Sequence, residues 1–155
     1  MAVVKLKSTI FGVTGVNGYQ APDSSALQGV FHRVAGRVTN GATDNAGSTY
    51  LIAQIPWNAI LLHDSTIRTD AWGFAQAVVG TPEDTDGLYD AAKGAVATGV
   101  ALFAAYSARW NQPLWKQLGL ASMPNKPFAD LLFFAKADAA AAGTADFDIR
   151  YALHI

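Results

Sequence analysis

The sequence predicts an all-β protein: an antiparallel β-sandwich, jelly-roll-like, with one or two short helices and an extended N-terminal arm. Three observations support this fold class. Short segments alternate apolar and polar residues with a period of two, clusters of Gly, Asn, Asp, Thr and Pro separate them, and strands do not alternate regularly with helices as a parallel sheet would require. The 155 residues are the length of a single domain with one core.

Seven segments are predicted to be strands, and a segment near Val3–Lys7 would make an eighth. In Val30–Thr39 the period-2 alternation of apolar residues indicates one buried face. The other six are Thr49–Ile55, Ile60–Thr69, Phe74–Val79, Gly87–Tyr89, Phe128–Ala137 and Thr144–Leu153. We expect the last two to pair as a β-hairpin across the Ala-rich loop at 139–143, because Thr144–Leu153 alternates strictly between apolar and polar residues.

Two segments break the β pattern. Gln112–Gly119 has Pro113 at a first helical position and a glycine at the stop, which predicts a helix of about two turns that plugs one end of a sheet. The Ala-rich segment Val100–Ala108 is a candidate second short helix. Residues 1–26 are rich in Gly and carry only scattered apolar residues, so we expect an extended arm followed by a sandwich domain over 27–155.

Composition narrows the classes of partner. Eleven Lys and Arg against twelve Asp and Glu give a formal net charge of -1, which argues against nucleic acid or anionic lipid as the main partner. The longest weakly polar stretch, Gly94–Ala108, falls short of the roughly 20 apolar residues that span a bilayer, so we expect no membrane partner. Only 15% of residues are charged and 51% are hydrophobic, which favours a protein partner over an isolated monomer.

No catalytic constellation is present in the sequence. It has no cysteine and no G-x-S-x-G motif, and neither Ser65 nor Ser107 has an assignable base. The acidic segment at 83–90 contains the D-x-D-G core of a calcium loop but lacks the remaining ligands, so a solvated acidic turn is the preferred interpretation. We expect no enzyme activity, no cofactor and no metal.

The three histidines leave one alternative open. His32, His63 and His154 lie in strand-like segments without a local metal-ligand spacing, which usually indicates a structural role. A site assembled from distant strands, with His32, His63 and Asp64 as ligands, would make the protein a jelly-roll metalloenzyme.

Aromatic residues in turn-like contexts are the candidate binding groups of the domain. Trp57 follows a proline, Trp72 precedes a glycine and Trp110 precedes an asparagine, positions where large apolar groups tend to mark interfaces. Trp115 is instead expected in the core beneath its helix. Exposed tryptophans could also stack on sugars, which keeps a carbohydrate-binding role open.

A succession of short motifs resembles a known family. The chain carries I-P-W-N-A at 55–59, G-L-Y-D at 87–90, P-L-W-K-Q-L-G-L at 113–120 and A-G-T at 142–144. This order is similar to that of a family of small tailed-bacteriophage virion proteins, often encoded close to the major capsid protein, over roughly Thr49 to Tyr151. The acidic stretch at 84–86 and the Gly-rich arm depart from the family's pattern.

The resemblance implies a jelly-roll-like sandwich that sits on the outside of the phage head as a decoration or cement protein without enzyme activity. Its partners would then be the major capsid protein and further copies of itself, with a homotrimer favoured and a dimer open. On this interpretation Lys5, Lys7, Phe11 and Tyr19 on the arm are the expected capsid contacts, and Trp57, Trp72 and Trp110 the interface aromatics. The alternative is a receptor- or carbohydrate-binding sandwich of the virion.

Overall fold

The computed structural model describes residues 30–94, 100–102 and 107–153. Within these residues it contains nine strands, one 3-10 turn and one short helix. In chain order the elements are β1 Val30–Asn40, β2 Thr49–Pro56, β3 Ile60–Leu61, β4 Thr66–Arg68, β5 Gln76–Thr81, β6 Asp84–Ala92, β7 Val100–Ala101, η1 Ser107–Arg109, α2 Leu114–Gln117, β8 Phe128–Phe134 and β9 Gly143–Leu153.

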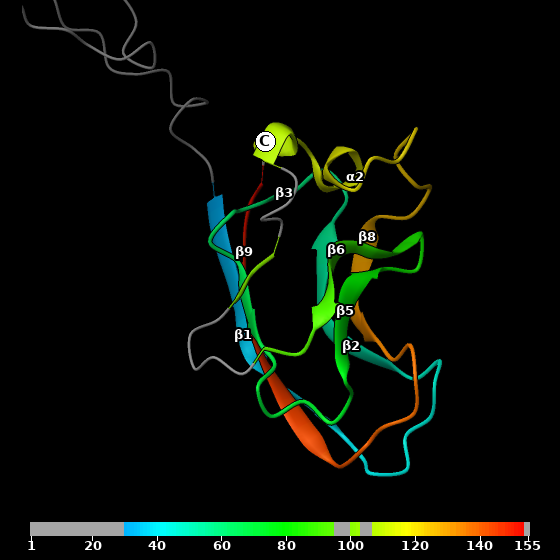
Figure 1. The fold of residues 1–155 in the computed structure, drawn as a ribbon. Helices are drawn as coiled ribbons and strands as arrows, with labels where there is room; N and C mark the ends of the chain where they lie inside the picture. Colours follow the sequence, from blue (N-terminus) through cyan, green and yellow to red (C-terminus); the bar gives the residue numbers. More distant parts are fainter. Residues whose placement is uncertain (1–29, 95–99, 103–106, 154–155) are drawn as a thin grey trace, which may run out of the picture.

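The strands form two antiparallel sheets that face each other, with α2 at one end (Figure 1). The first sheet has the order β1-β9-β4-β7, with β3 also paired to β9, and the second has the order β2-β8-β5-β6. If β3 and β4 are counted as two halves of one interrupted strand, the orders become 1-8-3-6 and 2-7-4-5, those of a double-sheet jelly roll. The all-β sandwich predicted from the sequence is confirmed.

The predicted hairpin between the last two strands is wrong. β8 pairs with β2 and β5, whereas β9 pairs with β1, β3 and β4 in the other sheet. The loop between them crosses from one sheet to the other and is held to the β1–β2 connection, where the Ala139 amide donates to the Asp44 carbonyl at 2.8 Å. Period-2 alternation determines which face of a strand is buried, but it carries no information about which strand lies beside it.

The single strand predicted over Ile60–Thr69 is two short strands joined by a turn. Between the two strands, the buried side chain of Ser65 takes the place of backbone hydrogen bonds to β9. Its hydroxyl donates to the Arg150 carbonyl and accepts from the Arg150 amide, both at 2.9 Å. The turn leaves His63 and Asp64 exposed at the sheet margin.

The helix predicted at Gln112–Gly119 is present but shorter, with a single turn in α2. Gly119 ends it with a positive φ of 77°, and the Gly119 and Leu120 amides donate to the Lys116 and Trp115 carbonyls at 3.0 Å, which is a Schellman motif. The prediction of a second helix over Val100–Ala108 is wrong for those of its residues that the structure describes. Its first two residues form β7 against β4, and a 3-10 turn begins at Ser107; residues 103–106 lie outside the described part.

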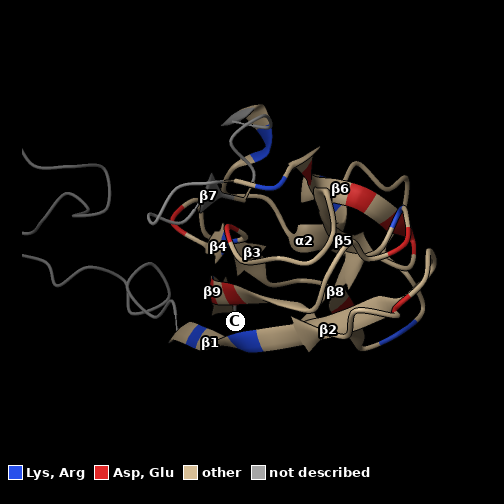
Figure 2. Ribbon diagram, turned by 60° about the horizontal axis from the view of Figure 1, so that its bottom comes forward, with Lys and Arg blue, Asp and Glu red and all other residues tan. Residues whose placement is uncertain are grey.

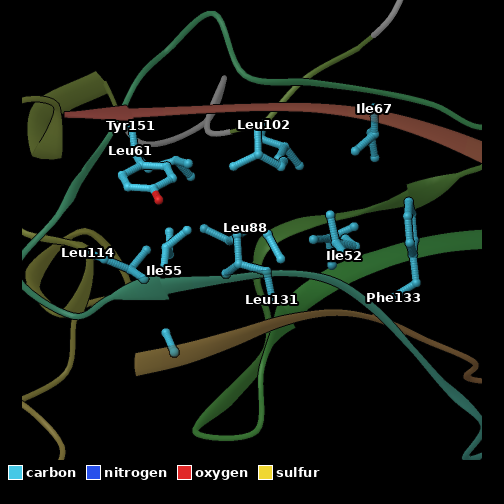
Figure 3. Close-up of a cluster of buried hydrophobic side chains, with 14 of the residues drawn as sticks. Ile52, Ile55, Leu61, Ile67, Leu88, Leu102, Leu114, Leu131, Phe133 and Tyr151 are labelled. Atoms are coloured by element: carbon cyan, nitrogen blue, oxygen red, sulfur yellow. The ribbon is translucent and has the colours of Figure 1, made fainter. Parts of the chain in front are cut away.

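Buried side chains from both sheets interdigitate to form one core (Figure 3). Ile67, Leu61 and Tyr151 come from the first sheet, and Ile55 and Phe133 come from the second. The end opposite α2 is closed by buried Asn40, whose side-chain amide donates to the Ala141 carbonyl at 2.8 Å and accepts from the Gly73 amide at 3.0 Å.

Candidate interaction surfaces

Trp57 and Trp72 lie in the core, so the prediction that they are interface aromatics is wrong for both. Their side chains are 1% and 2% exposed. The turn after β2 packs beneath α2, where the Trp115 amide donates to the Trp57 carbonyl at 3.4 Å, and the ring of Trp72 lies edge-on to Tyr50 with 5.1 Å between centroids. These two turns close over the open ends of the sandwich, so both indoles point inward.

Trp110 is a surface aromatic. It is 43% exposed and stacks on His63, with 5.2 Å between ring centroids and 23° between ring planes. The stack joins the residue after η1 to the turn between β3 and β4, so two distant parts of the chain build this platform. A role for Trp110 in an interface stays a prediction.

The predicted arm contacts are not among the described residues. Lys5, Lys7, Phe11 and Tyr19 all lie outside them, and so does the strand predicted near Val3–Lys7. The proposed boundary between an arm over 1–26 and a sandwich over 27–155 falls outside them as well.

The alternative metal site is not assembled. His32 stacks on Tyr151 at 5.0 Å and His63 stacks on Trp110, so the two imidazoles make separate ring contacts. Among the residues that the structure describes, no group of three or more His, Asp or Glu side chains is arranged to hold a metal ion. In the same part of the chain, no helix is both long and apolar enough to cross a membrane.

The outer face of the first sheet, here called the charged face, is a lattice of Arg–Asp pairs. Figure 2 shows basic positions in blue on β1 and acidic positions in red on β9. Arg33 on β1 forms a two-point pair with Asp148 on β9, with both N–O distances at 2.9 Å. Arg150 contacts the same carboxylate and also Asp64 at 2.8 Å. Farther along the same two strands, Arg37 pairs with Asp146. Arg68 on β4 pairs with Asp70. The four Arg are balanced by four Asp, so this face needs no external charge.

This lattice shifts the pKa of its carboxylates downward. Hydrogen bonds from Arg33 and then Arg150 lower the pKa of Asp148 from 3.8 to about 2. The pKa values of Asp146 and Asp70 are also lowered, chiefly by their hydrogen bonds from Arg37 and Arg68. The ionised form of each of these carboxylates therefore stabilises the folded state more than its protonated form does.

Acid is expected to weaken the fold over the range set by Asp148. Because the pKa of this group is about 2 in the folded state and about 3.9 in an unfolded chain, its ionised form stabilises the fold above about pH 4, and that contribution is lost as the pH falls toward about 2. Urea denaturation of Asp148→Asn should show a smaller drop in the free energy of unfolding over this range than wild type. Asp130→Asn, on the other sheet, serves as the control. Equal drops in wild type and Asp148→Asn would contradict the prediction.

The outer face of the second sheet is different in kind. The cross-strand register places Leu51 opposite Leu132, Thr49 opposite Phe134 and Pro56 opposite Phe128. Leu51 and Phe128 are 52% and 51% exposed, and Leu132 and Phe134 are half-buried. We call the surface formed by Leu51, Phe128, Leu132 and Phe134 the apolar face. The Gln54–Asp130 pair lies between Phe128 and the other three side chains, so the face is apolar around one polar pair. Exposed apolar side chains grouped in this way mark interaction sites on soluble proteins.

This face was not predicted from the sequence, although β8 carries a signal for it. Its inward positions Ala129, Leu131 and Phe133 are buried, and three of its four outward positions are also apolar. A strand that is apolar on both faces is typical of one covered on both sides. The sequence alone does not place β2 beside β8, and it is this pairing that brings Leu51 next to Leu132.

Comparison with known proteins supports the fold. No protein-family model matches the chain, and no curated protein matches it. A solved structure described as "Cyanophage Pam1 capsid asymmetric unit" contains a chain similar to this one. The TM-score is 0.53 at 15% identity, over 91% of this chain and 97% of that chain. At this level of identity the two chains share a fold along nearly their whole lengths.

Proposed function

We propose that this protein is a structural component of a tailed-phage virion, a decoration or cement protein that binds the outside of the head and bridges subunits of the major capsid protein. The observation that carries the proposal is the jelly-roll likeness to a chain of a phage capsid asymmetric unit, which spans 97% of that chain. The motif succession from I-P-W-N-A to A-G-T supports the same assignment. The role requires binding and no catalysis.

The two outer faces of the sandwich suit such a role. The charged face satisfies its own charges and can remain in water, whereas the apolar face needs a cover. Copies held together in a closed oligomer, most simply a trimer or a dimer, would contact several shell subunits at once and gain avidity from weak individual contacts.

Co-sedimentation with empty phage heads tests the proposal, with the solution mass taken by light scattering on the same sample. We expect saturable binding by an oligomer. A deletion of residues 2–20 should abolish this binding while the near-ultraviolet circular dichroism of the sandwich is retained, because Lys5, Lys7, Phe11 and Tyr19 are the proposed shell contacts. A full-length protein that stays in the supernatant would refute the assignment, and a truncated protein that binds like wild type would refute the role of the arm.

A second candidate function is carbohydrate or receptor binding by the virion, and the exposed Trp110–His63 stack favours it. The face of an indole buries apolar area against a sugar ring. Glycan binding that quenches tryptophan fluorescence and is lost in Trp110→Ala would support this function. Retention of binding in Trp110→Ala would place the sugar elsewhere.

A further inference from the structure

The two sheets differ in the charge that their strands carry. The strands of the first sheet contain Arg33, Arg37, Arg68, Arg150, Asp146 and Asp148, four basic and two acidic residues. The strands of the second sheet contain Asp84, Asp86, Asp90 and Asp130 and no Lys or Arg. The second sheet is therefore the more acidic of the two.

Two of these carboxylates stand beside the apolar face and are held by neutral side chains. The Gln54 side-chain amide donates to Asp130 at 2.7 Å, and the Gln76 amide donates to Asp90 on the neighbouring strand pair. A glutamine amide donates a hydrogen bond to the carboxylate but leaves the negative charge of that carboxylate in place. Asp86 is paired with Lys136 at 3.7 Å, whereas Asp90 and Asp130 form no salt bridge with any described residue. The face thus combines exposed Leu51 and Phe128 with two carboxylates whose charge no described residue pairs. Its complement is an apolar surface that carries Lys or Arg.

A second copy of the described domain fits this requirement poorly. Two apolar faces in contact would bring Asp90 and Asp130 of each copy together, and Lys136, just after β8, is already paired with Asp86 at 3.7 Å. The Arg side chains of the charged face are already engaged in pairs with Asp, and a stacked copy could use them only by breaking those pairs.

The N-terminal segment at 2–11, A-V-V-K-L-K-S-T-I-F, has the complementary chemistry. It carries Lys5 and Lys7 among five large apolar residues, and the first acidic residue of the chain is Asp23. The 18 residues at 12–29 connect it to the start of β1, and an extended chain of that length reaches roughly 60 Å. A tether of this length gives the segment a millimolar effective concentration at any face of its own domain.

We propose that residues 2–11 dock on the apolar face of their own molecule, with Lys5 and Lys7 beside Asp90 and Asp130. The docked segment covers Leu51 and Phe128 in the free protein and so limits aggregation through this face. The docking does not depend on the proposed function. If the same segment also reaches a capsid shell, the two contacts compete, and binding to the shell exposes the apolar face.

The cysteine-free chain allows a direct test in the full-length protein. A nitroxide attached at Ser8→Cys should broaden the methyl NMR signals of Leu51 and Leu132 more than those of Ala35 and Ala152, which lie on the charged face. The broadening should disappear in Lys5→Glu/Lys7→Glu and return when Asp90→Lys and Asp130→Lys are added. Methyl signal dispersion shows that each variant is folded.

Three results would overturn the proposal. Equal broadening of the two faces would show that the segment has no preferred site. Broadening that survives Lys5→Glu/Lys7→Glu would show that charge does not direct it. A third experiment distinguishes docking within one molecule from docking between two. Spin-labelled protein without isotope enrichment is mixed with isotope-enriched protein that carries no spin label. If Leu51 is broadened in this mixture as strongly as in the first experiment, the docked segment belongs to a second molecule.

Discussion

Replacement of Trp72 with alanine is expected to destabilise the protein by about 3–5 kcal/mol, the range for deletion of a large buried aromatic side chain. The ring contacts Tyr50, Phe74 and Phe133 at centroid distances of 5.1–5.3 Å, so its loss leaves a cavity between the two sheets. For a domain of this size the melting temperature should fall by roughly 10 °C in a calorimetric scan.

Trp110→Ala is the matched control, because the same side chain is removed from the surface. We expect a clearly smaller loss than for Trp72→Ala, since Trp110 is 43% exposed and its ring lies on the surface against His63. A Trp72→Ala variant as stable as Trp110→Ala would mean that Trp72 is not in the core. This pair of variants therefore distinguishes a core residue from an interface residue without any knowledge of the partner.

Replacement of Gln117 with alanine is expected to cost about 2–4 kcal/mol. The buried Gln117 amide accepts from the Leu61 backbone N–H at 3.1 Å and donates to the Leu61 carbonyl at 2.9 Å. It therefore occupies the position that a neighbouring strand would take beside β3 and ties α2 to the first sheet. Alanine leaves two buried backbone groups without partners, and each costs about 1–3 kcal/mol.

Lys116→Ala on the same helical turn is the control, because its side chain is exposed. Gln117→Glu is a second variant that retains the acceptor and loses the donor, so it should also be less stable than wild type at neutral pH. Urea denaturation measures all three. A free energy of unfolding for Gln117→Ala within about 0.5 kcal/mol of that for Lys116→Ala would contradict the proposed clamp.

The contrast between the two outer faces accounts for the low proportion of charged residues in the chain. The charged face gathers four Arg and four Asp in one lattice. The opposite sheet retains Leu51, Leu132 and Phe134 on its outer side. An apolar face of this kind needs a cover, which we propose that residues 2–11 supply in the free protein.

Local pattern was sufficient for the long strands, but not for β7, which was predicted as part of a helix, or for the break between β3 and β4. Val30–Thr39 and Thr144–Leu153 were predicted nearly to their observed bounds, because period-2 alternation is a property of a few consecutive residues. The stop of α2 at Gly119 was predicted for the same reason, since a positive φ favours glycine. The all-β class followed from these local signals and from the turn clusters between them.

The pairing of strands and the placement of side chains near turns were decided only in the tertiary structure. β8 and β9 are adjacent in the chain yet lie in different sheets, since a jelly roll pairs strands that are far apart in sequence. Trp57 and Trp72 are buried because other segments close over their turns, which no local pattern records. The apolar face exists only once β2 lies beside β8 and brings Leu51 opposite Leu132. The sequence by itself thus determined the long strands and which face of each is buried, because both depend on consecutive residues, whereas long-range packing determined which apolar side chains stayed on the surface.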